Sequence, residues 1–217
     1  MNKHSNIFGI VFNFFLPKNK FDADIENVTS DELSKRLIQN NKINGYTYTM
    51  FSYKDELIKN MIWSIKYRRN QKTAKIFALM IYDFIAEEFS DLAIYSDFKD
   101  PILIPIPTSK EHIRKRGVDH TEVLAKEFCI IANKDFCVLR TDILKKIKNT
   151  KSQTLFERKA RLENIIGSFG INREKTIENR NIILLDDVTT TGATLGEARK
   201  VLLDAGAKNV ICVTIAH

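Results

Sequence analysis

Two adjacent carboxylates and a group of threonines follow the apolar run Ile182 to Leu185. A short continuous apolar run indicates a strand that is covered on both faces of a parallel sheet. In open parallel sheets, ligands bind beyond the carboxyl ends of the strands. We therefore expect a binding site in the segment that comes next, which consists of Asp186, Asp187, Val188, Thr189, Thr190, Thr191, Gly192, Ala193 and Thr194.

The residue types in this segment suit a phosphorylated sugar. A turn that leads into a helix points several backbone N–H groups at one place, and the helix N-terminus adds partial positive charge there. The threonine hydroxyls are further donors, and Gly192 lets the backbone approach a phosphate closely. Asp186 and Asp187 can accept hydrogen bonds from vicinal hydroxyls, so the segment predicts a ribose 5-phosphate site. The alternative interpretation is an N-capped helix after a buried strand, with exposed acids.

Apolar spacing predicts the elements that position this segment. Residues 29–32 have capping-box spacing, and Gly206 follows the last helix in the manner of a C-cap glycine. We expect helices at residues 29–38, from 57 to the basic cluster at 66–69, and at 73–89, 118–128, 155–165 and 195–205. We expect strands at 46–53, 102–104, 136–139, 181–185 and 210–215, and a loop at 141–153.

Strand and helix alternate from Pro101 onward, which implies right-handed parallel crossovers. The expected fold class is therefore α/β, with an open, mostly parallel, doubly wound sheet and an N-terminal helical extension. We place the boundary between an extension at residues 1–44 and the main domain at residues 45–217.

The composition favours an anionic partner. Lys and Arg number 34 against 27 Asp and Glu, which gives a formal net charge of +7. Such an excess suits a phosphorylated small molecule or a nucleic acid, and it is equally consistent with a solvated basic surface. The three cysteines form no C-x-x-C pair, and His4, His112, His120 and His217 show no metal-ligand spacing, so we expect surface histidines. The apolar segment 7–16 is too short to span a bilayer, and we expect a soluble, cytoplasmic protein.

The apolar strand, acidic pair and Thr-Thr-Gly-x-Thr loop resemble the signature of type I phosphoribosyltransferases. Pro105 and Pro107, followed by Arg114 to Gly117, resemble the corresponding region of ComF-like proteins. The resemblance extends over roughly residues 46–217, including the helix from Leu57 through Lys66. Two features depart from it. The chain lacks the cysteines of the N-terminal zinc module that is usual in ComF-like proteins, and Val118, Asp119 and His120 stand where Phe-Asn-Gln is expected.

The resemblance implies binding of 5-phosphoribosyl-1-pyrophosphate with Mg²⁺, and transfer of the phosphoribosyl group to an acceptor that the sequence does not identify. Asp186 and Asp187 would then be the catalytic pair that holds the ribose hydroxyls, with no protein ligand bound directly to the metal. The pyrophosphate would face a basic turn that consists of Thr108, Ser109, Lys110, Arg114 and Arg116. The alternative is that this turn simply faces solvent. A hood over the ligand, or else a solvated loop, would include Lys151, Gln153 and Arg158.

A second function is compatible with the same residues. ComF-like proteins are associated with natural competence and the import of single-stranded DNA. The phosphate cradle and the basic loops would then hold a nucleic-acid backbone, or contact the DNA-uptake machinery, while aromatic side chains stack on bases. The acidic pair favours the transferase, and the basic charge favours the DNA-binding module. The sequence indicates no oligomeric state.

Overall fold

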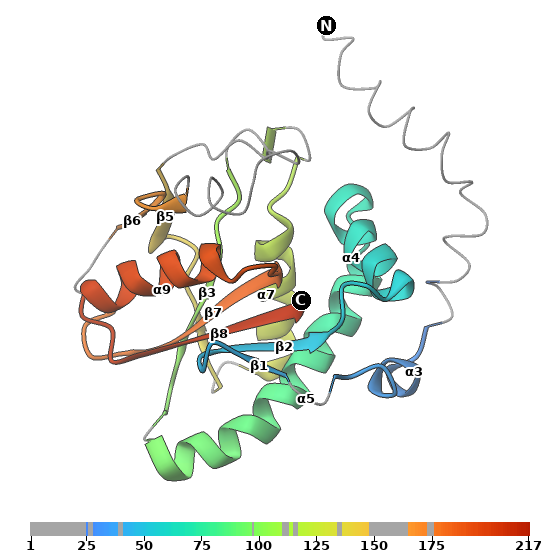
Figure 1. Ribbon diagram of the computed structural model, residues 1–217, viewed down its shortest axis with the longest axis horizontal. Coiled ribbons are helices and arrows are strands. Elements are labelled where there is room, and N and C mark those ends of the chain that lie inside the picture. Colours follow the sequence, from blue (N-terminus) through green and yellow to red (C-terminus); the bar gives the residue numbers. More distant parts are fainter. Residues whose placement is uncertain are drawn as a thin grey trace, which may run out of the picture.

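The computed structural model describes residues 25, 28–38, 41–96, 98–109, 113–114, 117–133, 136–147, 165–172 and 176–217 of the chain. Within these residues, the chain forms both strands and helices (Figure 1). The strands are β1 (Lys42–Ile43), β2 (Thr47–Phe51), β3 (Ile102–Pro105), β4 (Val138–Leu139), β5 (Leu144–Lys146), β6 (Phe169–Ile171), β7 (Asn181–Val188) and β8 (Asn209–Ala216). The helices are α3 (Ser30–Ser34), α4 (Glu56–Arg68), α5 (Gln71–Ser96), α7 (His120–Ala132) and α9 (Ala193–Asp204).

The main sheet has the strand order β1-β2-β8-β7-β3-β4 in the described part of the chain. Every pair in it is parallel except β1 with β2. The predicted open, mostly parallel sheet is therefore confirmed. From β3 the chain crosses through α7 to β4, whereas from β7 it crosses through α9 to β8 in the opposite direction. The order of strands reverses between β7 and β3, and at such a point a crevice opens at the carboxyl ends.

Side chains of β7 alternate between two hydrophobic cores, as the pleat of a strand requires. Ile183 and Leu185 pack in a core with residues of α4, α5 and α7. Ile182 and Leu184 pack in a second core with residues of α9 and of the β5–β6 pair. Figure 1 shows α5 and α9 on opposite sides of the sheet, so both faces are covered. This explains why β7 and β8 are almost continuously apolar.

Capping side chains mark the starts of α3 and α4, whereas α3 ends earlier and α5 later than the sequence predicts, at Ser34 and Ser96. Thr29 Oγ1 accepts a hydrogen bond from the Glu32 amide over 3.2 Å, which confirms the predicted helix start. Asp55 caps α4, accepting from the amides of Leu57 and Ile58. Arg36 Nη1 donates to Asp55 Oδ2 over 2.7 Å, so the end of α3 is tied to the start of α4.

The segment predicted as a loop, residues 141–153, contains a strand. Leu144 to Lys146 pair antiparallel with Phe169 to Ile171 in a separate two-stranded sheet. Neither strand shows apolar periodicity in the sequence. The pairing instead depends on tertiary contacts, because Leu144 and Phe169 are buried in the core on the α9 side. The expected helix at residues 155–165 lies, up to residue 164, outside the described residues.

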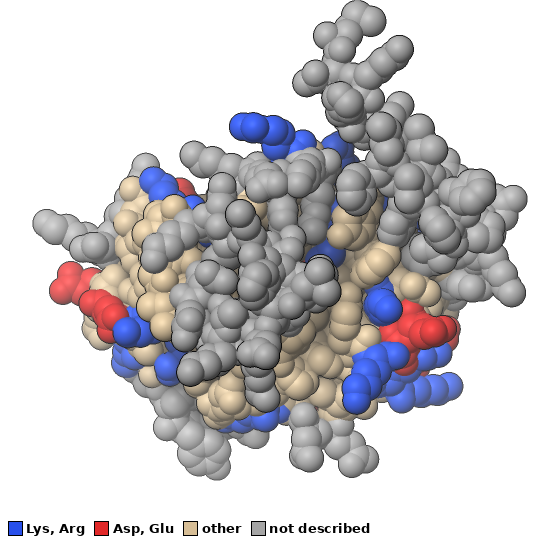
Figure 2. All heavy atoms as spheres, turned by 45° about the horizontal axis from the view of Figure 1, so that its top comes forward, with Lys and Arg blue, Asp and Glu red and all other residues tan. Residues whose placement is uncertain are grey.

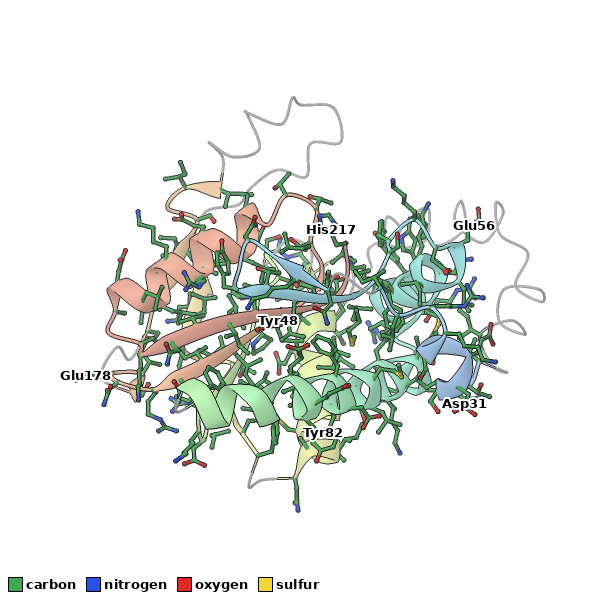
Figure 3. The ribbon with its side chains drawn as sticks, turned by 60° about the horizontal axis from the view of Figure 1, so that its bottom comes forward. Asp31, Tyr48, Glu56, Tyr82, Glu178 and His217 are labelled. Carbon is green, nitrogen blue, oxygen red and sulfur yellow. The ribbon has the colours of Figure 1, made fainter. Side chains whose placement is uncertain are left out.

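Two labelled residues in Figure 3 mark the two ends of the parallel strands. Glu178 precedes β7 at the amino ends, and His217 follows β8 at the carboxyl ends. The expected boundary between residues 44 and 45 falls in the turn of the β1–β2 hairpin and stays a prediction. Among the described residues, no helix has the length and apolar character needed to cross a membrane.

Candidate functional site

Asp186 and Asp187 are at the carboxyl end of β7, beside the point where the strand order reverses. Because they are consecutive on a strand, their side chains point to opposite faces of the sheet. Asp187 is on the same face of the sheet as Ile183 and Leu185, which is the face toward α4 and α7. Asp186 is on the same face as Leu184, toward α9. The Asp187 amide donates to Asp186 Oδ1 over 2.9 Å, and the Val188 amide donates to Asp187 Oδ1 over 2.8 Å. The strand backbone therefore fixes one oxygen of each carboxylate.

The remaining oxygen of Asp187 faces two basic side chains. Lys66, in the last turn of α4, forms an ion pair with Asp187 Oδ2. His120 Nε2, at the start of α7, lies 3.4 Å from the same oxygen. The prediction that His120 is a surface residue is wrong, because its side chain is only 8% exposed. It lies instead with Asp187 among Ile62, Ile65, Leu124 and Ile215.

Burial and charge act oppositely on the two carboxyls. Burial raises the pKa of Asp187, but the positive charge of Lys66 and a hydrogen bond from His120 outweigh it, and the net shift is strongly downward. The pKa of Asp186 is raised well above its usual range, first by burial and then by the negative charge of Asp187. In the ligand-free site, Asp187 is therefore the carboxylate that holds its charge, and Asp186 is the one that takes up a proton more readily.

Lys146 on β5 approaches the acidic pair from the other face of the sheet. Burial lowers the pKa of Lys146, and the charge of Asp186 partly opposes this. Its ammonium also lies 5.9 Å from the centre of the Phe169 ring, on the paired strand β6. The residue expected on a mobile loop is thus on a strand, within electrostatic range of the site.

The loop between β7 and α9 has the form expected of a phosphate cradle. The Thr189 amide donates to Ala216 O over 3.0 Å, which anchors the start of the loop to β8. Gly192 is the N-cap of α9 with a φ of 74°, and no side chain caps the helix. The Ala193 amide makes a long contact of 3.4 Å with Thr191 Oγ1. The first turn of α9 therefore directs amides into the loop without a carboxylate in front of them, which is the arrangement that binds anions.

The rest of the predicted cradle is partly accessible. Thr190 is exposed, and Thr191, Ala193 and Thr194 are half-buried, whereas Thr189 and Gly192 are buried. His217 Nε2 lies 2.9 Å from Thr190 O, so the residue after β8 contacts the backbone of this loop. The exposed and half-buried threonines are the ones whose hydroxyls can reach a bound phosphate.

The turn after β3 lies beside the acidic pair. Pro105 pairs with Leu185, and the Ile106 amide donates to Leu185 O over 2.8 Å, so the chain leaves β3 next to Asp186. Ser109 is buried and Thr108 half-buried in this turn, while Arg114 is exposed. Thr108 is held by Asp119, the N-cap of α7. The turn and the acids thus flank the crevice where the strand order reverses.

Several predicted site residues lie outside the described part of the chain. They are Lys110 and Arg116 of the basic turn, and Lys151, Gln153 and Arg158 of the expected hood.

Residues that the sequence did not single out as part of the site also contact it, among them Lys66, Asp119, His120 and His217. Asp119 immediately precedes a helix, so the sequence does indicate that it could be an N-cap. Lys66 is at a helix end, where a cation is ordinary. No local pattern could indicate its pairing with Asp187, because the contact joins distant parts of the sequence.

The described residues contain no group of three or more His, Cys, Asp or Glu that could hold a metal ion.

Basic side chains form no continuous stripe on the described atoms of the face in Figure 2. Lys and Arg lie there at several separate places, some with Asp or Glu beside them. At the site itself, Lys66 and Lys146 place positive charge close to the acidic pair.

Comparison with known families and proteins gives consistent matches. Residues 85–217 match the family model described as phosphoribosyl transferase domain. The competence protein ComFC of Bacillus subtilis is 32% identical over 158 residues, which cover 73% of this chain and 58% of that protein. ComFC of Streptococcus pneumoniae is 28% identical over 74% of this chain and 63% of its own length. Competence protein F of Haemophilus influenzae is 29% identical over 50% of this chain and 46% of its own length.

These matches confirm the resemblance to ComF-like proteins, although the chain spans less than two thirds of each of these relatives. Solved structures that resemble the chain include an HGPRT-ase from Leishmania tarentolae in complex with GMP, at 14% identity. That structure has a TM-score of 0.35 and covers 66% of each chain. A hypoxanthine phosphoribosyltransferase from Staphylococcus aureus has 16% identity and a TM-score of 0.34, and covers 63% of this chain and 62% of its own.

Proposed function

Because the chain belongs to the phosphoribosyl transferase domain family, we propose that it binds 5-phosphoribosyl-1-pyrophosphate with Mg²⁺ at the carboxyl ends of β7 and β3. The phosphoribosyl group would then be transferred to an acceptor. The observation that carries this proposal is the sequence of features at the end of β7: an acidic pair, a threonine loop, and a helix whose N-cap is a glycine without a capping side chain.

Each part of the ligand has a matching group in the site. The amides of the first turn of α9 and the hydroxyls of Thr190, Thr191 and Thr194 would bind the 5-phosphate. Asp186 and Asp187 would accept hydrogen bonds from the ribose hydroxyls. The turn at Thr108 and Ser109 and the guanidinium of Arg114 would face the diphosphate, with Lys110 and Arg116 as further members of the basic set.

The side chains of the site are compatible with a Mg²⁺ ion that binds together with the ligand. Mg²⁺ keeps several waters and is bound largely through substrate phosphates, so it does not require a cage of protein ligands. The described residues provide no such cage. When bound, Mg²⁺ would neutralise charge that develops on the leaving diphosphate.

In the transfer, a nucleophilic atom of the acceptor forms a bond to C1 of the ribose while the bond from C1 to the diphosphate oxygen breaks. The diphosphate leaves with the electron pair of that bond. The protein's contribution is to orient the sugar through its two ends and to hold the anionic leaving group against basic side chains. An ionised Asp187 beside the ribose ring also suits an electron-deficient C1.

Binding of phosphoribosyl pyrophosphate, measured by calorimetry with and without Mg²⁺, tests the proposal. Asp186→Asn is the informative variant, because Asp187→Asn would leave the buried Lys66 without its partner, which costs about 3–5 kcal/mol in comparable cases. We expect Mg²⁺-dependent binding by the natural protein and its loss in Asp186→Asn. Binding that survives this substitution unchanged would refute the assignment of the site.

The alternative is a module that binds single-stranded DNA in natural competence, and a surface of α4 favours it. Trp63 and Tyr67 form an edge-to-face pair with ring centres 5.7 Å apart, and Tyr67 is 51% exposed. The ammonium of Lys59 lies 5.9 Å from the Trp63 ring centre. An exposed aromatic ring, with a second ring and a lysine beside it, is the kind of surface that holds unpaired bases.

Salt dependence separates the two functions. DNA binding through phosphates weakens steeply as salt rises, and replacing Asp186 by Asn leaves it intact. Trp63→Ala and Tyr67→Ala would weaken binding to a single strand by this route and leave binding of phosphoribosyl pyrophosphate in place. If instead Asp186→Asn abolishes binding of phosphoribosyl pyrophosphate, and Trp63→Ala and Tyr67→Ala do not affect binding to a single strand, the transferase is supported.

A further inference from the structure

The ion pair between Lys66 and Asp187 links the candidate site to a helix outside the region that matches the family model. Lys66 is on α4 (Glu56–Arg68), whereas the match begins at residue 85. The side chains of Lys66 and Asp187 are only 18% and 11% exposed. A charged contact this enclosed is held in one geometry by its surroundings.

The packing of α4 dictates where Lys66 points. Ile58, Ile62 and Ile65 are buried in the core between α4 and the sheet, so the helix is fixed along this face. Ile62 and Ile65 lie beside Asp187. Lys66 therefore emerges at the carboxyl ends of the strands, in the last helical turn, where a positive charge also suits the helix dipole.

An ion pair in this position is weak evidence for stability alone. Removing an ammonium and a carboxylate from water costs about as much as their attraction returns, and apolar side chains of similar volume often serve as well. What distinguishes this pair is its acidic member, which is one of the two carboxylates proposed to hold the ribose. The physical effect of Lys66 is thus exerted on a residue of the site.

We infer that Lys66 is a positioning residue, which holds the Asp187 carboxylate ionised and in a fixed orientation for the ribose hydroxyls. This inference rests on the proposed function and extends it, because the ribose site is then completed by the N-terminal half of the chain. Asp186, on which burial and the charge of Asp187 outweigh the charge of Lys66, is the partner carboxylate that adjusts its charge when the ligand arrives.

The charged groups around Asp187 agree with this role. Lys66 faces it from α4, His120 from α7 and Asp186 from β7 itself. Burial lowers the pKa of Lys66, but the charge of Asp187 more than offsets this, and the net shift is upward. Lys66 therefore remains an ammonium, and Asp187 remains a carboxylate.

A second contact brings the same end of α4 to the other side of the site. Arg69, which ends the helix with a φ of 55°, lies so close to Gly117 that a Cβ at Gly117 would overlap its guanidinium. Gly117 is in the connection between β3 and α7, on the basic turn proposed for the diphosphate. Residues 66–69 thus touch both segments that flank the crevice.

Lys66→Met tests the inference, with Lys200→Met as the matched control. Lys200 is an exposed lysine in the C-terminal half of α9, so its loss removes the same charge away from the acids. Affinity for phosphoribosyl pyrophosphate with Mg²⁺ is measured from about pH 5 to about pH 8. For Lys66→Met we expect affinity near neutral pH to fall on the order of a hundredfold. Affinity should also rise more steeply with pH than in the natural protein, because without the ammonium the two acids share a proton.

The other variants define the remaining outcomes. Lys66→Arg should restore the affinity and the pH profile of the natural protein, and Lys200→Met should match it throughout. Binding of inorganic phosphate, which probes the cradle of α9, should be unchanged in Lys66→Met. If Lys66→Met is too unstable to purify, Lys66→Gln keeps a donor for Asp187 and removes only the charge, and the same pH profile is measured.

The inference and the proposed function fail in different ways. If the natural protein binds the ligand and a folded Lys66→Met or Lys66→Gln has the same affinity and pH profile, the role of Lys66 is overturned and the proposed function stands. If the natural protein does not bind phosphoribosyl pyrophosphate at all, both are overturned.

Discussion

The amide and the hydroxyl of Thr108 both donate to the carboxylate of Asp119, over 2.9 and 3.0 Å. The same carboxylate accepts from the Thr121 amide and caps α7. One side chain therefore sets both the first turn of a helix and the conformation of the turn proposed to face the diphosphate.

Replacing Asp119 with Ala should destabilise the protein by about 1–2 kcal/mol through loss of the cap. It should also weaken binding of inorganic pyrophosphate, because Thr108 loses the group that orders it. Chemical denaturation and calorimetry measure the two effects. Asp55→Ala is the control, since Asp55 caps a helix of the same length and makes no bond to the turn. It should lower stability similarly and leave pyrophosphate binding intact.

Replacing Asp186 with Asn should stabilise the ligand-free protein at neutral pH, on the order of 1 kcal/mol, while it abolishes ligand binding. Burial and Asp187 raise the pKa of Asp186 on folding. A carboxyl with a raised folded pKa contributes stability that is complete below its unfolded pKa of about 4 and is lost as pH rises through the folded value. The gain from Asn should therefore grow with pH. Thermal unfolding of both proteins across this range measures it, and equal stability at neutral pH would contradict the raised pKa.

Replacing Gly192 with Ala should destabilise the protein by about 1 kcal/mol or more and weaken phosphate binding. Its φ of 74° is unfavourable for a side chain, and a Cβ there would lie 2.9 Å from Asn44 Nδ2. Gly206→Ala is the control at the other end of α9, where φ is 92° and the nearest atom is Glu178 Cγ at 3.7 Å. Both variants should unfold more easily, and only Gly192→Ala should lose affinity for inorganic phosphate. Equal phosphate affinity in the two variants would argue against the cradle.

Replacing His120 with Ala should destabilise the protein by about 2 kcal/mol, because a buried ring is lost beside Leu124 and Ile215. Asp187 keeps Lys66 as its partner in this variant. Affinity for phosphoribosyl pyrophosphate should therefore fall less than in Lys66→Met. Denaturation curves and calorimetry of the two variants provide the comparison, and a larger loss of affinity in His120→Ala would make His120 the main support of Asp187.

Local patterns predicted most of the fold because its main elements carry strong local signals. The strands around Ile183 and Val213 are continuous apolar runs, and Thr29 and Gly206 mark the ends of helices by their own conformational preferences. The acidic pair and the threonine loop could be placed at a sheet edge for the same reason. These features are determined by neighbouring residues in the sequence.

The β5–β6 pair and the surroundings of Asp187 could not be predicted in this way. Leu144 pairs with Ile171 across a long connection, and three-residue strands are too short to show alternation. The side on which Asp187 lies follows from strand periodicity, but its contact with Lys66 depends on how α4 packs against the sheet. His120 is buried for the same tertiary reason.

The edge strands of the main sheet determine how other chains can associate with it. Its outermost strands, β1 and β4, are two residues long. On the β1 side, Ile38 donates to Met50 O and Thr49 donates to Asn41 O, so irregular backbone already occupies much of the rim of β2. A foreign peptide would find few open amides and carbonyls to extend the sheet at either rim. The main sheet is thus protected against aggregation by strand addition, and association of another copy or another protein with it would proceed through side-chain surfaces.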